Sequence, residues 1–481
     1  MVLNFRAVIK VLGILTLIEG LFMLPALLIA LIFEEWDSAS AFLTTSSVCI
    51  SIGFVILTQL KFDKIILKAR EGYFIAAISW VYCSVISTIP IYFSGPDLPL
   101  VSCFFESVAG FTTTGCSVMD INILPNSILF WRALTHWLGG MGILVLLITI
   151  FPLWGVNNKS IALAETPGTN TSTLGTNYTR IGGFLYKTYL TLSVTEFLLL
   201  VLGPMDWFNA LITVCSSIST AGLIIKPEFA YLYEMEYVRL VVIIFTVLST
   251  MNFTTYLLIV NKRWREVLKS IEVRVFFSII SVATLLVAVS LRLSGTYTSL
   301  WQAAKDGLCQ VISFISTSGF YVCDYTNWPS FTITILILLL FVGGCSYSTS
   351  GSLKVFRVAV LYKFIKRGIL KQVHPNIVRA ITLDDGTPVS AKVASSISIH
   401  TLLYFATLFL GCILLSFNNL DMETTFTTAL GIFTNTGLSL GLPASSGFFG
   451  MFNGFSQLVM CFLMIAGRLE MYAIVIVFTK S

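Results

Sequence analysis

Four short segments combine hydroxyl side chains with a glycine, and each has the form hydroxyl, Thr or Asn, small or hydroxyl, Gly. A dehydrated alkali cation such as K⁺ needs several oxygen ligands, and rings of backbone carbonyls supply them. Glycine allows the unusual dihedrals that aim successive carbonyls at one axis. The segments are Thr112, Thr113, Thr114 and Gly115; Ser219, Thr220, Ala221 and Gly222; Ser316, Thr317, Ser318 and Gly319; and Thr434, Asn435, Thr436 and Gly437.

The alternative interpretation of these segments is helix packing, because Ser, Thr and Gly are common where membrane helices touch. One segment alone would favour that interpretation. The four recur at similar intervals along the chain. Their repetition favours four loops around one axis.

A short amphipathic segment precedes each loop and is too short to span a membrane, which takes about 20 residues. Acidic, proline or hydroxyl residues near the start of each favour helix capping. Irregular backbone at membrane depth survives where it is buried in protein or lines a wet cavity. We therefore expect re-entrant half-helices over 98–111, 206–218, 298–315 and 421–433.

The composition places these half-helices in a membrane protein. Of 481 residues, 56% are hydrophobic and 11% are charged, whereas soluble domains have about 25% charged residues. This excludes most soluble enzymes, nucleic-acid binders and disordered scaffolds. Ten apolar stretches are long enough to span: 7–33, 39–60, 72–93, 127–153, 181–203, 238–261, 275–293, 331–361, 393–417 and 448–479.

Charge asymmetry orients the spans. Placing the N-terminus in the cytoplasm puts most of the 29 Lys and Arg residues on the cytoplasmic side, as the positive-inside rule requires. The half-helices then enter from the acidic outer face, and their partially negative C-terminal ends point to the pore centre, where they favour a cation.

The predicted fold is an all-α polytopic membrane protein of about ten transmembrane helices. Four pseudo-repeated helix–pore-loop–helix units surround one central pore, and a two-helix hairpin precedes them. The expected divisions are 1–65 for the hairpin and 66–155, 156–262, 263–370 and 371–481 for the pore units.

Residues 343–352 (GGCSYSTSGS) interrupt the expected second helix of the third unit. Glycine weakens a helix by about 1 kcal/mol relative to alanine, and serine competes for backbone hydrogen bonds. We expect this segment to unwind in the cavity below the four loops; close helix packing is the alternative. The gate candidates within it are Gly343, Gly344, Cys345, Ser346 and Gly351.

Arg468 is a second gate candidate, because it lies in an apolar stretch where a charge costs at least about 2.5–3.5 kcal/mol. The alternative is an ion pair with Glu470 or with an acid on a neighbouring helix. Among the other ionisable residues, Glu106 lies in the first half-helix and could brace the loop that follows it. His136 stands beside glycines, which favours close packing over proton transfer.

Two basic segments are candidate docking sites for a regulator. Residues 263–269 (RWREVLK) have this character, although the positive-inside bias alone explains their charge. Residues 363–392, with a turn at Asp384, Asp385 and Gly386, are the longest polar stretch and the better candidate.

Several motifs resemble the potassium-transporter superfamily of Trk, Ktr and HKT proteins, and specifically its Trk-type membrane subunit. The resemblance covers nearly the whole chain, and the two extra N-terminal helices are similar to Trk rather than Ktr. The motifs are AGFTTTG (109–115), WRALTHWLGGMGI (131–143), AETPG (164–168), SISTAG (217–222), LKQVHPN (370–376), FTNTG (433–437) and AGRLE (466–470).

The resemblance implies a K⁺ selectivity filter formed by the four loops. It implies that K⁺ binds at Thr112, Thr113, Ser219, Thr220, Ser316, Thr317, Thr434 and Asn435. Each loop keeps one glycine, which predicts looser selectivity than that of a dedicated channel. The resemblance also makes 343–352 an obstructing loop and Arg468 a positive barrier. Tyr347, Ser350 and Ser352 depart from the family's more glycine-rich form of the loop.

The resemblance further implies a homodimer in a bacterial inner membrane, bound to a cytosolic TrkA-like ring that senses nucleotides (NAD, ATP or ADP). K⁺ is the permeant ion, and neither an organic cofactor nor a nucleic-acid partner is expected.

The leading functional hypothesis is gated K⁺ permeation. Secondary K⁺ symport with H⁺ or Na⁺ is the alternative, although alternating access usually involves inverted repeats, and the repeats here run in one orientation. The sequence has no motif that would favour an intramembrane enzyme.

Overall fold

The computed structural model describes residues 5–60, 65–66, 69–94, 98–142, 156–157, 178–222, 235–320, 323, 325–374, 389, 391–441 and 448–471.

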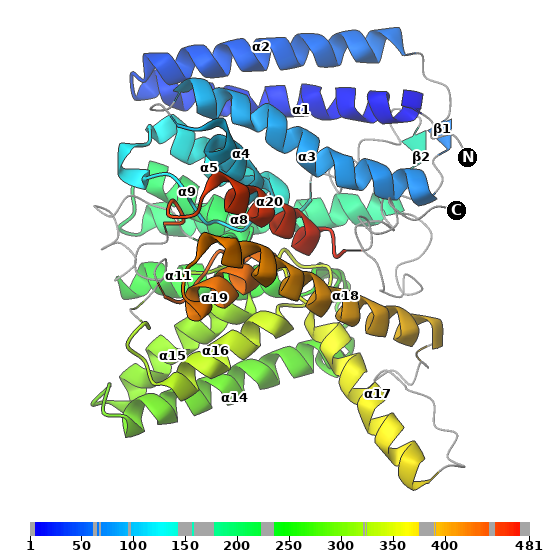
Figure 1. Ribbon diagram of the computed structural model, residues 1–481, viewed down its shortest axis with the longest axis vertical. Coiled ribbons are helices and arrows are strands. Elements are labelled where there is room, and N and C mark those ends of the chain that lie inside the picture. The colour runs from blue at the N-terminus through cyan, green and yellow to red at the C-terminus, as the bar shows by residue number, and fades with distance from the viewer. Residues whose placement is uncertain are drawn as a thin grey trace.

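The N-terminal hairpin packs along the first pore unit. Helices α1 (Phe5–Ile32) and α2 (Trp36–Gln59) lie side by side at the top of Figure 1. In the turn between them, Glu35 accepts hydrogen bonds from the backbone N–H groups of Asn126 (2.6 Å) and Ser127 (2.9 Å). The hairpin therefore satisfies donors at the start of α5.

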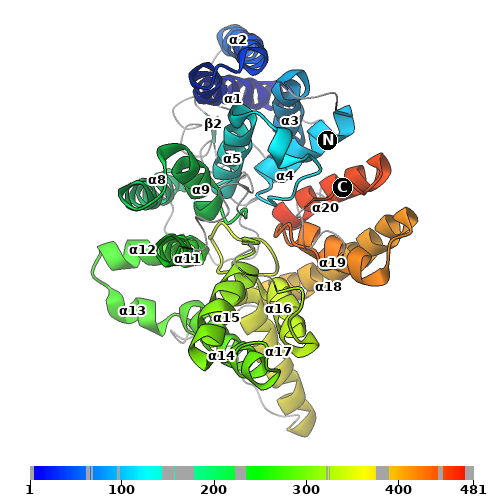
Figure 2. The ribbon, with the colours of Figure 1, turned by 90° about the vertical axis from the view of Figure 1, so that its left-hand side faces the viewer.

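Four units follow the hairpin, each containing a long helix, a half-helix and a second helix. Figure 2 shows them arranged around a common centre, with the hairpin outside. The units are α3 (Ala69–Ser94), α4 (Leu100–Phe111) and α5 (Asn126–Gly140); α8 (Tyr178–Leu202), α9 (Trp207–Ile218) and α11 (Glu236–Thr250); α14 (Ile271–Leu293), α15 (Leu300–Ile315) and α16 (Ser330–Val342); and α18 (Ala391–Leu415), α19 (Met422–Phe433) and α20 (Gly454–Arg468).

The four half-helices begin and end within two residues of the expected positions, which confirms the prediction. Asp206 caps α9 by accepting from the N–H groups of Phe208 and Asn209, both at 3.1 Å. Asp421 caps α19 through the N–H of Thr424 at 2.8 Å, and this bond holds the pKa of Asp421 below its ordinary value. At the described N-cap residues Pro99 and Ser299, no side-chain capping bond forms. Asp97 lies outside the described residues.

The second helix of each unit is shorter than its apolar stretch. The sequence predicted such a break only at 343–352, but α5, α11 and α20 also end early, at Gly140, Thr250 and Arg468. α11 turns by 92° into α12 (Phe253–Val260). By length and composition, six of the described helices could span a membrane, or seven if α11 and α12 form one broken span.

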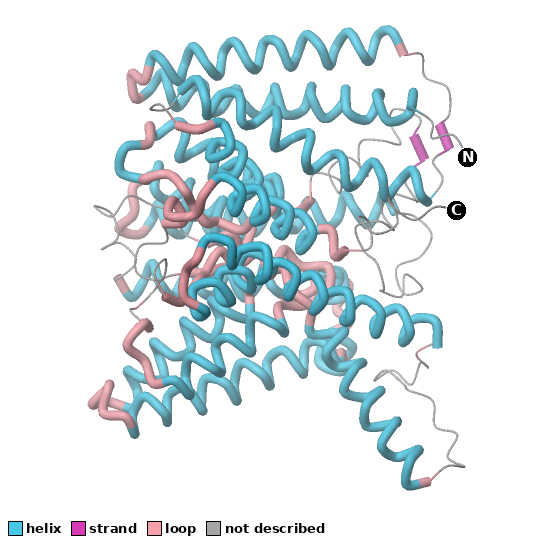
Figure 3. The backbone as a smooth tube through the Cα atoms, viewed as in Figure 1, coloured by secondary structure: helices cyan, strands magenta, loops and turns pink. Residues whose placement is uncertain are grey.

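The remaining elements are short or lie at the ends of the units. Helix α17 (Val355–Val373) extends away from the other helices, as Figure 1 shows. Loop segments lie among the helices as well as at their ends (Figure 3). The other elements are η1 (Ile121–Ile123), α13 (Trp264–Lys269), η5 (Ser416–Asn418), and strands β1 (Ile65–Ile66) and β2 (Val156–Asn157), which pair in parallel.

Candidate functional site

Each half-helix ends in the same turn. The C-cap residue has right-handed helical dihedrals, and the next residue has a positive φ of 53–57°. That position usually belongs to glycine, and a β-branched residue there is strained. The four residues in this conformation are Thr113, Thr220, Thr317 and Asn435. The sequence pattern did not reveal this, because its glycines lie two positions later.

Backbone N–H groups of the turn bond back into the helix end. The N–H of Thr114 donates to the carbonyl of Ala109 at 3.0 Å, and the equivalent bonds in the other loops measure 2.8–3.1 Å. In a turn that alternates right- and left-handed residues, successive N–H groups point to one side. With that side occupied by the helix end, the carbonyl oxygens of the loop can face the other side.

The four loops form a closed ring. A Cβ added to Gly115 would lie against the carbonyl oxygen of Ala221, in the second loop. The same relation joins Gly222 to Ser318, Gly319 to Thr436, and Gly437 back to Thr114. Every one of these contacts would be under 3.0 Å, closer than real Cβ atoms approach. We call residues 112–115, 219–222, 316–319 and 434–437 the loop ring. Glycine is required here by the next loop as well as by its own positive φ.

In three of the loops, the hydroxyl groups of the first and third residues bond to each other. Thr112 and Thr114 share a hydrogen bond of 2.9 Å, and so do Ser316 with Ser318 and Thr434 with Thr436, at 2.8 Å each. Thr112 also donates to the carbonyl of Val108 at 2.7 Å. These side chains therefore support the turns, and the backbone carbonyls are the oxygen atoms that all four loops share.

A buried ion pair braces the first loop. Glu106 lies 2.7 Å from Arg132, and the two side chains are 0% and 3% exposed. The other oxygen of Glu106 accepts from the N–H groups of Val118 (2.7 Å) and Met119 (3.1 Å), in the irregular segment that leaves the ring. The sequence suggested the brace but missed Arg132, whose signal was a charge within an apolar stretch.

Other units brace the same place with uncharged groups. In the third unit, Gln310 donates to the carbonyl of Cys323 at 3.1 Å. In the fourth, the Thr428 and Ser439 hydroxyls lie 2.9 Å apart. The ion pair of the first unit is therefore a variation on a repeated contact.

Residues 343–352, which we call the intramembrane loop, lie directly against the loop ring. The N–H of Gly351 donates to the Thr317 hydroxyl at 2.8 Å, and the hydroxyls of Thr220 and Thr349 are 3.2 Å apart. A Cβ on Gly351 would meet the carbonyl of Thr434. The segment is thus unwound, as expected, and it touches the second, third and fourth loops.

Arg468 completes this layer beneath the first loop. Its guanidinium donates to the Thr113 hydroxyl (3.2 Å), to the Thr349 carbonyl (2.7 Å) and to the carbonyls of Gly139 (2.5 Å) and Gly140 (2.8 Å). Its Cζ lies 5.8 Å from the Trp80 ring centroid. Arg468 stands at the C-terminal end of α20 rather than within a continuous helix.

Glu470, the expected alternative partner of Arg468, forms an ion pair with Arg357 instead. Arg357 belongs to α17, which follows the intramembrane loop. The pair therefore links the third and fourth units, a contact that sequence spacing could not indicate.

Glu272 anchors the other end of the intramembrane loop, and the sequence did not single it out. One carboxylate oxygen accepts from the N–H of Ser346, and the other accepts from the Asn252 side chain at 2.8 Å. The N–H of Cys345 donates to the carbonyl of Thr250 at 3.1 Å. Glu272 is 5% exposed. The gate candidates Cys345 and Ser346 are thus held by the broken second helix of the second unit and by α14.

The other candidates are placed as follows. His136 is buried on α5, and Arg263 of the 263–269 segment pairs with Glu266 at 2.6 Å. The polar segment 363–392 is described mainly as the last part of α17. Its turn at 384–386, and the motif at 164–168, lie outside the described residues.

Known proteins match this chain over most or all of its length. A family model described as TrkH, cation transport protein, matches residues 38–481. The chain is 31% identical to the Trk system potassium uptake protein TrkG of Escherichia coli K12, covering 99% of this chain and 98% of the relative. It is 29% identical to TrkH of Halomonas elongata, over 100% and 99%. The crystal structure of the potassium transporter TrkH from Vibrio parahaemolyticus superposes with a TM-score of 0.87, at 26% identity and 99% coverage of both chains.

Proposed function

This chain belongs to the TrkH family of cation transport proteins, and we propose that it takes up K⁺ across the bacterial inner membrane through the loop ring. It is a transport protein of the membrane rather than an enzyme. The relatives named as Trk system potassium uptake proteins support K⁺ as the ion.

The closed loop ring is the observation that carries this proposal. Four loops with the same backbone conformation bring four sets of carbonyls to one place, and such rings replace the hydration shell of K⁺. The four half-helices also direct their C-terminal ends to this ring, and each end contributes a partial negative charge that favours a cation. The proposed ligands are the carbonyls of the eight residues expected above, beginning with Thr112 and Thr113.

The proposed mechanism is gated permeation, with the intramembrane loop and Arg468 forming the closed gate. Both contact the loop ring, so an ion leaving the ring would meet a backbone segment and a fixed positive charge. Opening requires the hydrogen bonds at Thr113, Thr220 and Thr317 to break.

Regulation by a cytosolic nucleotide-binding ring, a homodimeric state and a cytoplasmic N-terminus are parts of the same proposal. Basic residues along α17 support the orientation through the positive-inside rule. The same helix extends away from the other helices (Figure 1), which suits it to contact a regulator. Its exposed cations include Lys366, Arg367 and Lys371.

Secondary symport with H⁺ or Na⁺ remains the alternative to permeation. Three acids among the described residues near the proposed path are engaged: Glu106 with Arg132, Glu272 with Ser346 and Glu470 with Arg357. These contacts favour structural roles for the three carboxylates. A reversal potential that follows K⁺ alone supports permeation, whereas one that shifts with pH or Na⁺ supports symport.

The decisive experiment compares K⁺ and Na⁺ flux in vesicles containing wild type, Gly115→Ser or Gly437→Ser. Each substitution places a Cβ against a carbonyl of the neighbouring loop, so we expect K⁺ flux to fall about tenfold or more and selectivity to be lost. The control is Gly295→Ser, at a glycine of similar φ (77°) with nothing within 4 Å of its added Cβ. Unchanged selectivity in both ring variants would refute the filter assignment.

A further inference from the structure

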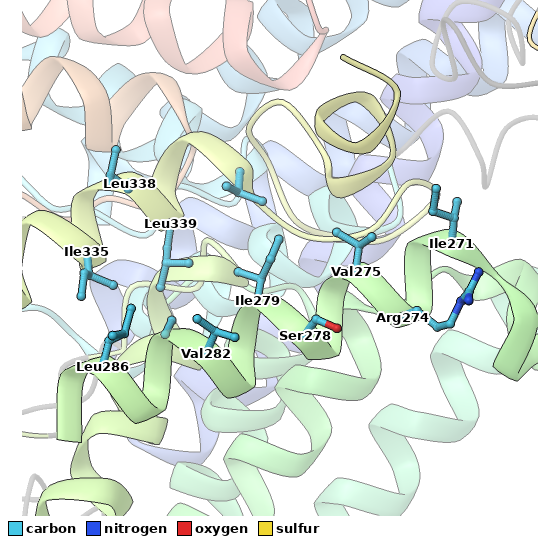
Figure 4. A pocket seen from close by; sticks show the side chains of 12 residues that line it. Ile271, Arg274, Val275, Ser278, Ile279, Val282, Leu286, Ile335, Leu338 and Leu339 are labelled. Carbon is cyan, nitrogen blue, oxygen red and sulfur yellow. The ribbon is translucent and has the colours of Figure 1, made fainter. Parts of the chain in front are cut away.

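A groove runs between α14 and α16, away from the loop ring. It has a volume of about 730 Å³, and of its lining residues only Arg274 and Ser278 are polar. Figure 4 shows Arg274 at one end of the groove and Leu286 with Ile335 at the other. The groove is therefore apolar along most of its length and has one polar end.

The length of the groove matches a lipid chain in one leaflet. From Arg274 to Leu286 the helix rises about 18 Å, at 1.5 Å per residue. The hydrocarbon core is about 30 Å thick, so each leaflet supplies about half of it. An acyl chain that starts near Arg274 would thus lie along the groove to the region of the midplane.

A basic cluster precedes the polar end of the groove in the chain. We call residues 261–274, from the end of α12 to the first turn of α14, the elbow. All of these residues are described, and the elbow has five exposed basic residues and one exposed acid, Glu266. Glu266 already pairs with Arg263. The basic cluster consists of Lys262, Arg263, Arg265, Lys269 and Arg274. This charge favours an anionic group beside the mouth of the groove.

Apolar side chains at the same elbow indicate the membrane interface. Trp264 is 55% exposed and Leu268 is 69% exposed, both on the short helix α13. Tryptophan beside cations is typical of the headgroup level of a bilayer, and clusters of 4–8 basic residues next to a span attract anionic lipids. The elbow therefore combines a cationic headgroup site with the mouth of an acyl-chain groove.

We propose that the α14–α16 groove and the basic cluster form a binding site for one anionic phospholipid. Its phosphate lies among Arg265, Lys269 and Arg274, and one acyl chain fills the groove. Bulk lipid meets every apolar face, so the distinguishing property of this site is selectivity for the charged headgroup. The site is on the cytoplasmic leaflet in the orientation proposed above, and it is separate from the ion path.

The groove lies beside the residues that hold one end of the intramembrane loop. The groove is lined by Val342, the last residue of α16, and by Ile271, the neighbour of Glu272. The intramembrane loop begins at the residue after Val342 and is held by Glu272 through Ser346. A chain in the groove therefore contacts both helices that hold this end of the intramembrane loop.

Native mass spectrometry of the full-length protein, purified with equal amounts of phosphatidylglycerol and phosphatidylcholine, tests the proposal. We expect wild type to retain phosphatidylglycerol in preference. The triple variant R265Q/K269Q/R274Q should lose that preference by about fivefold for each charge removed. The matched control K366Q/R367Q/K371Q removes three exposed cations from α17 and should keep it.

A second pair of variants tests the groove without changing charge. Val282→Trp fills the groove and should reduce phosphatidylglycerol retention severalfold, whereas Leu285→Trp, on the same helix at a 65% exposed position outside the groove, should not. Equal retention of the two lipids by wild type would overturn the proposal, as would full retention by the triple variant or by Val282→Trp. Disulfide cross-linking of Val282→Cys between two chains in a membrane would assign the groove to a second copy and also overturn it.

Discussion

The loop ring and the layer beneath it differ in symmetry. In the ring, all four loops share a turn, a positive-φ residue and a glycine packed against the next loop. In the layer beneath, the intramembrane loop comes from the third unit alone and Arg468 from the fourth. All four second helices end early, and among the described residues the end of α16 leads into the ten-residue intramembrane loop.

This difference separates two physical requirements. Coordinating an ion on an axis needs similar oxygens on all sides, so every unit must keep the same backbone geometry. Blocking a path needs one obstacle, so a single unit can change without disturbing the others. Repetition in the chain thus marks the proposed ion site, and departure from repetition marks the proposed gate.

The largest expected effect comes from breaking the charged brace of the first loop. Arg132→Met leaves Glu106 buried without its cation, and removing one partner of a buried pair destabilises a protein by about 3–5 kcal/mol. We expect a marked fall in the thermal unfolding midpoint of the purified protein and weak expression. The double variant E106Q/R132M should recover much of the loss, because it buries no unpaired charge.

A matched control for this brace is Arg239→Met, which breaks the 3.1 Å ion pair with Asp306. The Arg239 side chain is 17% exposed and that of Asp306 is 12% exposed. It should destabilise the protein less than Arg132→Met. Equal effects at the two sites would contradict a special role for the first-loop brace.

Neutralising Arg468, which the fourth unit contributes beneath the loop ring, should have the next largest effect. Arg468→Met removes the hydrogen bonds to Thr113 and Thr349 and the positive charge beneath the ring. We expect the initial rate of K⁺ flux into vesicles to rise about tenfold, which corresponds to about 1.4 kcal/mol of barrier. Arg468→Lys keeps the charge and should stay near the wild-type rate. Unchanged or lower flux in Arg468→Met, at normal expression, would argue against a barrier.

The smallest effect is expected at the anchor of the intramembrane loop. Glu272→Gln weakens the bonds to Ser346 and Asn252, because a hydrogen bond to a charged group is worth roughly 1 kcal/mol more than a neutral one. K⁺ flux should rise about fivefold. Glu423→Gln, at an exposed acid near the start of α19, serves as the control. If the two variants conduct alike, Glu272 does not hold the gate closed.

Much of the molecule could be predicted from the chain because local chemistry specified it. The half-helices were placed within two residues, since capping residues and abrupt Ser, Thr and Gly runs mark their ends. The break at 343–352 was expected because three glycines and four serines fall within these ten residues. The breaks after Gly140, Thr250 and Arg468 were missed because apolar sequence continues past them. Hydropathy reports burial in a membrane and says nothing about where a helix turns.

Amino-acid sequence by itself determined the number of repeats, the membrane setting and the residues of the four loops, because composition and periodicity are local properties. Tertiary structure decided that each glycine faces the carbonyl of the next loop, that Glu106 pairs with Arg132, that Glu272 bonds to Ser346, and that Glu470 pairs with Arg357. These contacts join residues far apart in the chain, and only packing can choose among the partners that the same charges and hydroxyls would accept.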